Sequence, residues 1–110
     1  MLRLHGCSPA ELHDKLLRGD DFVLLDVRNA EELELARVKG CLHIPLNELE
    51  NRIGELESCR HKEIVVMCHH GVRSSMAQGI LTEWGFPAVR NLVGGIDAYA
   101  ATVDPRVGFY

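Results

Sequence analysis

The chain has 110 residues, with 12 Lys and Arg residues against 16 Asp and Glu residues and a formal net charge of −4. This mildly acidic balance argues against nucleic acid or an anionic membrane surface as the main partner, and no apolar run approaches the length of a membrane span. The length predicts one domain, residues 1–110, with a single sizeable core.

The four cysteines are spaced irregularly, at Cys7, Cys41, Cys59 and Cys68. Irregular spacing in a chain that can form its own core favours reduced thiols, which are typical of the cytosol, over a disulfide framework. The segment before Gly6 is too short for a secretory signal. We therefore expect a cytoplasmic protein, and we expect it to be a monomer.

A helix is predicted at residues 9–18. Ser8 is a suitable N-cap, Pro9 fits the first helical position, and Glu11 completes a capping box. Gly19 should end the helix.

The next run, residues 22–25, is short and continuously apolar, which is typical of a strand buried on both faces of a parallel sheet. Asp26 and Arg28 follow at its carboxyl end, where ligands bind in open parallel sheets. The residues alone favour an N-cap or a salt bridge that holds a loop for Asp26, and a surface ion pair for Arg28, over direct catalysis by either side chain.

The middle of the chain alternates short elements. Residues 29–35 predict a helix that is acidic at its start, as the helix dipole prefers. Residues 42–44 predict a short strand closed by Pro45. Residues 46–57 carry apolar side chains at helical spacing.

An apolar, β-branched run, residues 64–67, stops at Cys68. After a short polar loop the apolar residues fall on one helical face, namely Ala77, Ile80, Leu81 and Trp84. Cys68 is therefore predicted at the point where a buried strand turns into a helix.

The remaining segment predicts a strand at residues 88–93, a turn at Gly94 and Gly95, and a helix at residues 96–101, with an irregular tail from Thr102. Strands alternate with helices throughout the chain. This order predicts an α/β fold, with a parallel-rich sheet covered by helices on both faces.

The position of Cys68 has chemical consequences. N–H groups at a helix start lack intrahelical partners and carry partial positive charge, so a loop over that end forms an anion site. A cysteine there should have a lowered pKa and act as a nucleophile. Gly71 allows unusual backbone angles, and Arg73 offers a fixed positive charge with forked donors, suited to an oxyanion.

The pattern Cys68-x-x-Gly71-x-Arg73-Ser74 resembles the active loop of rhodanese-like sulfurtransferases. Three further stretches resemble that family in the same order, so that the resemblance covers about residues 8–104: Asp26-Val27-Arg28, His43-Ile44-Pro45 and Gly94-Gly95. The chain departs from the family where Ala36-Arg37-Val38 replaces a common Gly-His-Ile, and where Tyr99 replaces a common tryptophan.

The resemblance implies a rhodanese-like domain with about five short strands and a persulfide on Cys68 as the reaction intermediate. The predicted substrate-binding residues are His69, His70, Gly71, Val72 and Arg73, and the predicted loop supports are Asp26, Arg28 and Ser74. The expected donor is a small sulfur-containing anion such as thiosulfate. The expected acceptor is cyanide or a cellular thiol, and no metal or organic cofactor is needed.

Other functions remain open at this point. Cysteine-dependent phosphatases and arsenate reductases also use a loop from Cys to Arg, but their loop is one residue longer than the four residues between Cys68 and Arg73. A non-catalytic rhodanese-like binding module commonly lacks the cysteine. Adjacent His69 and His70 are poorly spaced for a zinc site. Their side chains either line the mouth of the loop or face solvent.

Overall fold

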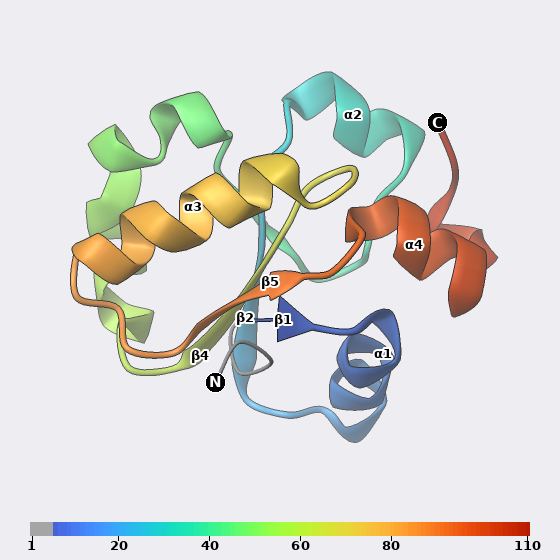
Figure 1. Ribbon diagram of the computed structural model, residues 1–110, viewed down its shortest axis with the longest axis horizontal. Helices are drawn as coiled ribbons and strands as arrows, with labels where there is room; N and C mark the ends of the chain where they lie inside the picture. Colours follow the sequence, from blue (N-terminus) through green and yellow to red (C-terminus); the bar gives the residue numbers. More distant parts are fainter. Residues whose placement is uncertain (1–5) are drawn as a thin grey trace.

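A computed structural model describes residues 6–110 (Figure 1). Within these residues, five strands form one sheet in the order β1-β5-β4-β2-β3, and all neighbouring pairs are parallel. The strands are Gly6–Cys7 (β1), Phe22–Asp26 (β2), Leu42–His43 (β3), Glu63–Met67 (β4) and Val89–Leu92 (β5). The parallel α/β fold predicted from the sequence is confirmed, whereas the two-residue β1 was not predicted.

Helices cover both faces of the sheet, with α3 on one side and α1 and α4 on the other (Figure 1). The α-helices are Pro9–Arg18 (α1), Ala30–Leu35 (α2), Val72–Glu83 (α3) and Gly95–Thr102 (α4), and the 3₁₀ helices are Leu46–Glu48 (η2), Glu50–Cys59 (η3) and Pro105–Val107 (η4). No helix in residues 6–110 combines the length and apolar character needed to cross a membrane.

The central strand β4 explains the continuous apolar run in the sequence. Ile64 and Val66 pack in the core cluster that includes Leu81 of α3, whereas Val65 and Met67 pack in the cluster that includes Tyr99 of α4. Successive side chains of a strand point to opposite faces, so a strand covered on both faces is apolar at every position.

The capping prediction for α1 is also confirmed. Ser8 Oγ accepts a hydrogen bond from Glu11 N at 3.1 Å, and Ser8 N donates to the Glu11 carboxylate. Gly19 ends the helix with φ +70°. These local contacts orient α1 so that Leu12 is fully buried beneath the sheet.

Three segments differ from the sequence-based expectation. Residues 46–57 form the 3₁₀ helices η2 and η3, and Gly54, a poor helix former, lies within η3. Trp84 is 49% exposed because it lies just past the end of α3, outside the helical face that buries Ala77. The tail, expected to be irregular, contains η4, and Tyr110 beyond it contacts Glu32 of α2.

The carboxyl ends of β2 and β4 lie side by side. Asp26 is in register with Met67, and Val27 N donates to Met67 O at 3.0 Å. The residues that follow both strands therefore share one edge of the sheet.

Gly95 allows α4 to approach the segment that follows β4. Ile96 N donates to Cys68 O at 2.9 Å and Asp97 N donates to His69 O at 3.1 Å. Gly95 has φ +66°, and a Cβ there would lie 2.6 Å from Cys68 O and closer still to His69 O. Only a residue without a side chain permits these contacts.

We predict that Gly95→Ala lowers the free energy of unfolding by at least about 2 kcal/mol, because it adds left-handed strain to a backbone clash. Gly54→Ala is the matched control, since nothing lies within 4 Å of its added Cβ. Urea unfolding of both variants measures the difference. Equal stabilities would contradict the close approach of α4.

Candidate active site

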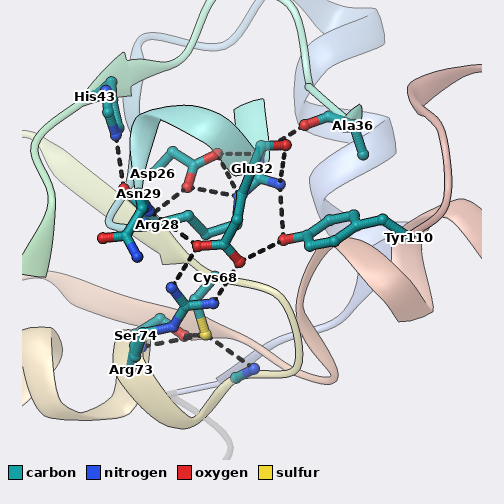
Figure 2. A network of polar contacts seen from close by, with 11 residues as sticks. Asp26, Arg28, Asn29, Glu32, Ala36, His43, Cys68, Arg73, Ser74 and Tyr110 are labelled. Carbon is teal, nitrogen blue, oxygen red and sulfur yellow. Dashed lines mark hydrogen bonds and ion pairs between the residues drawn. The ribbon is translucent and has the colours of Figure 1, made fainter. Parts of the chain in front are cut away.

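The turn between β4 and α3 surrounds the sulfur of Cys68, and its hydrogen-bond donors converge on this atom (Figure 2). Cys68 is 1% exposed. Its Sγ accepts hydrogen bonds from Gly71 N at 3.1 Å and from Ser74 N at 3.4 Å, and Ser74 Oγ lies 3.4 Å away. Gly71 has φ +105°, the left-handed conformation expected from the sequence. The turn thus directs two backbone N–H donors at a single atom and places the Ser74 hydroxyl beside it.

These contacts activate the thiol. Burial raises the pKa of Cys68, but the Ser74 hydroxyl and the N–H groups of Ser74, Gly71 and His70 stabilise the thiolate, and the net pKa is lowered. In contrast, burial raises the pKa of Cys7 to about 11. Because the thiolate is the nucleophilic form, Cys68 has the environment of a reactive cysteine.

Asn91 on β5 stabilises this turn through two hydrogen bonds. Its Oδ1 accepts a hydrogen bond from Ser74 Oγ at 2.5 Å, and its Nδ2 donates to Gly71 O at 3.2 Å. One amide therefore fixes two of the residues that contact the sulfur. Asn91 was not predicted from the sequence, because a single amide in a strand has no local pattern that indicates this contact.

Asp26 and Arg28 form a fully buried ion pair. Arg28 Nη2 donates to Asp26 Oδ2 at 2.6 Å and to Ala36 O at 2.8 Å, and the Arg28 carbonyl contacts His43 Nε2 at 2.6 Å. Burial lowers the pKa of Arg28, but the hydrogen bonds with Asp26 and Tyr110 raise it by more than burial lowers it. The net pKa is therefore raised and the guanidinium stays charged. A surface ion pair, the simplest expectation for Arg28, is therefore wrong. The pair ties β2 to α2 and the α2–β3 connection.

Arg73 forms a second ion pair, with Glu32 at the start of α2. Its Nη1 lies 2.6 Å from Glu32 Oε2 and its Nη2 lies 2.8 Å from Oε1, a two-bond arrangement (Figure 2). The hydrogen bonds from Arg73 lower the pKa of Glu32 to about 2. The sequence predicts Arg73 as a substrate-binding residue, and in the structure both of its terminal nitrogens are engaged by Glu32.

Tyr110 connects the two ion pairs. Its hydroxyl accepts from Arg28 Nη1 at 3.0 Å and donates to Glu32 Oε1 at 2.8 Å. Its ring stacks on His69 at 3.8 Å with an interplanar angle of 10°. The tail therefore reaches the active loop. This contact was not predicted, because the residues after Thr102 show no regular pattern in the sequence.

The other loop side chains differ in their exposure. The His69 and His70 rings are 3.9 Å apart, and His70 Nδ1 lies 4.0 Å from Asp97 Oδ2. His69 Nε2 is buried without a hydrogen-bond partner among the described residues. Val72, the first residue of α3, is 71% exposed. The His69 ring is therefore packed within the site, whereas His70 is exposed.

No group of three or more His, Cys, Asp or Glu side chains in residues 6–110 is arranged to hold a metal ion. All four cysteines lie in this part of the chain and are free.

A family model of the rhodanese-like domain matches residues 8–102. The chain belongs to the rhodanese-like domain family.

Individual relatives agree with this assignment. The adenylyltransferase and sulfurtransferase MOCS3 of Arabidopsis thaliana is 32% identical over 117 residues, covering 94% of this chain and 25% of that protein. The chain spans 20–38% of the length of such curated relatives. The structure of the human single-domain sulfurtransferase TSTD1 matches with a TM-score of 0.78 and 25% identity, over 89% of this chain and 96% of that one. A rhodanese-related protein from Thermoplasma volcanium matches with a TM-score of 0.80 and 28% identity, over 90% and 93% of the two chains.

In this rhodanese-like domain, we predict that Ser74→Ala raises the pKa of Cys68, because the contact of the hydroxyl with Sγ, which lowers this pKa, is lost while burial is unchanged. The pH dependence of iodoacetamide alkylation measures this pKa, and its midpoint should move to higher pH. Ser75→Ala, at the exposed neighbouring position, is the control. An unmoved midpoint in Ser74→Ala would show that the hydroxyl does not act on the sulfur.

Proposed function

We propose that this rhodanese-like domain is a sulfurtransferase that carries sulfur as a persulfide on Cys68. The observation that supports this most strongly is the set of donors around Sγ, with Gly71 N at 3.1 Å and Ser74 N at 3.4 Å. These groups lower the pKa of the thiol and converge on one sulfur atom. Relatives named as sulfurtransferases support the same reaction class.

The proposed reaction has two steps. The Cys68 thiolate attacks the outer sulfur of a donor such as thiosulfate, the sulfur–sulfur bond of the donor breaks, and sulfite leaves with the bonding electron pair. Cyanide or a cellular thiolate then attacks the terminal sulfur of the persulfide, and Cys68 leaves as thiolate. This double displacement predicts ping-pong kinetics.

Each part of the loop has a proposed role in this cycle. The N–H groups of Gly71 and Ser74 would stabilise the anionic terminal sulfur, as preorganised donors do for developing charge. His69, His70 and Val72 would form the approach for the donor. The chemistry uses no metal or organic cofactor, and we propose that the domain acts as a cytoplasmic monomer on small molecules, with neither nucleic acid nor membrane as a partner.

We predict that Cys68→Ser abolishes thiocyanate formation from thiosulfate and cyanide, because a hydroxyl at this position is neither ionised nor able to form a persulfide. Cys7→Ser, Cys41→Ser and Cys59→Ser should each retain most of the activity, since these thiols lack the donors that surround Cys68. A colorimetric thiocyanate assay distinguishes them. Full activity in Cys68→Ser would exclude the proposed intermediate.

A further prediction separates sulfur transfer from phosphate chemistry. The four residues between Cys68 and Arg73 form a turn that suits one sulfur atom, so the wild-type protein should hydrolyse an aryl phosphate negligibly. Inserting one glycine after Gly71 should displace the N–H donors by about an ångström and reduce sulfur transfer on the order of a hundredfold. Both assays on both proteins test this. Efficient phosphate hydrolysis by the wild type, with thiosulfate unused, would favour the phosphatase alternative.

A further inference from the structure

The charged side chains around Cys68 neutralise one another. Arg28 is held by Asp26, and Arg73 is held through both terminal nitrogens by Glu32. Asp97, the third carboxylate, lies 4.0 Å from His70. Among the described residues of this network, two guanidinium groups therefore face three carboxylates, and no guanidinium is left to meet an incoming anion.

Glu32 is held firmly in its position beside Arg73. Its carboxylate also accepts hydrogen bonds from Tyr110 Oη at 2.8 Å and from Asn29 N at 3.0 Å. Its side chain is 18% exposed. An anionic donor that recruited Arg73 would leave this half-buried carboxylate without its strongest partner, which is costly.

From this charge pairing we infer that the site takes sulfur preferentially from a donor of low charge, such as the protonated persulfide of a thiol, and that Glu32 disfavours dianionic thiosulfate. This inference rests on the proposed function and names its substrate class. The N–H donors of Gly71 and Ser74 stabilise a single sulfur atom. Because both guanidinium groups of the described network are paired, a second negative charge on the donor is not compensated there.

The reaction with a persulfide donor is balanced without a further reactant. The Cys68 thiolate attacks the outer sulfur of R–S–SH, and the donor sulfur–sulfur bond breaks. The donor leaves as R–S⁻, and Cys68 becomes a persulfide that keeps the proton on its terminal sulfur. No sulfite dianion has to leave through a site whose arginines are already paired.

Glu32→Gln tests this inference directly, because glutamine keeps the size and one acceptor oxygen but removes the charge. Two donors of similar shape are compared, dianionic thiosulfate and monoanionic methanethiosulfonate, with cyanide as the acceptor for both. Since the interaction energy scales with the donor charge, kcat/KM should rise about tenfold for thiosulfate and about threefold for methanethiosulfonate. An unchanged or lower value for thiosulfate, or equal gains for both donors, would overturn the inference.

Two further variants identify the source of the gain. Glu32→Gln combined with Arg73→Gln should lose the gain for thiosulfate, because the freed cation is gone. Glu57→Gln is the control, because it breaks a similar two-bond pair with Arg60. Arg60 precedes β4 and so lies near the amino end of this strand, whereas Cys68 follows its carboxyl end. This variant should leave the preference between the two donors unaltered. A gain that persists in the double variant would contradict the role of Arg73.

The outcomes also separate this inference from the proposed function. If thiocyanate forms from either donor and its formation requires Cys68, the proposed sulfurtransferase function stands, whatever the effect of Glu32→Gln. No thiocyanate from either donor with any variant would overturn the proposed function, and the inference with it. Thermal unfolding of each variant confirms that the compared proteins are folded.

Discussion

The site depends on one constraint, the tight turn that places backbone N–H groups around a buried sulfur atom. Gly71 supplies the positive φ that reverses the chain after β4, and α3 begins at the next residue. Asn91 holds the turn from β5, and the first N–H groups of α4 hold the carbonyls of Cys68 and His69. Three elements distant in sequence thus fix a geometry that lowers the pKa of Cys68 despite its burial.

A second layer of polar contacts surrounds this turn and determines its charge. The Asp26–Arg28 pair lies fully inside the protein, and Tyr110 links it to the Glu32–Arg73 pair. Removing one partner of such a pair leaves an uncompensated charge, so the network resists rearrangement. Within residues 6–110 the network thereby provides donors for a sulfur atom while both of its guanidinium groups, on Arg28 and Arg73, are paired.

Much of the fold follows from local sequence patterns. The capping box at Ser8, the doubly buried run of β4 and the strand-to-helix turn at Cys68 each depend on residues close together in the chain, and all three appear in the structure. Local periodicity did not indicate the 3₁₀ form of η3, where Gly54 interrupts the helical pattern.

The rest of the site could not be predicted, because its contacts join distant residues. Arg73 and Glu32 are separated by 41 positions, Ser74 and Asn91 by 17, and Tyr110 and Glu32 by 78. The local sequence around Arg73, a cysteine loop followed by a helix, predicts that this arginine binds an anion. Its actual partner depends on how α2 packs against the loop, which the spacing of residues does not specify.

The central claim is that Cys68 carries transferable sulfur. Intact-protein mass spectrometry after incubation with a sulfane-sulfur donor and removal of the excess tests it most directly. The account predicts a gain equal to one sulfur atom, located on the peptide that contains Cys68, and its complete loss on addition of cyanide. An unchanged mass, or the added sulfur on Cys7, Cys41 or Cys59 instead, would contradict it.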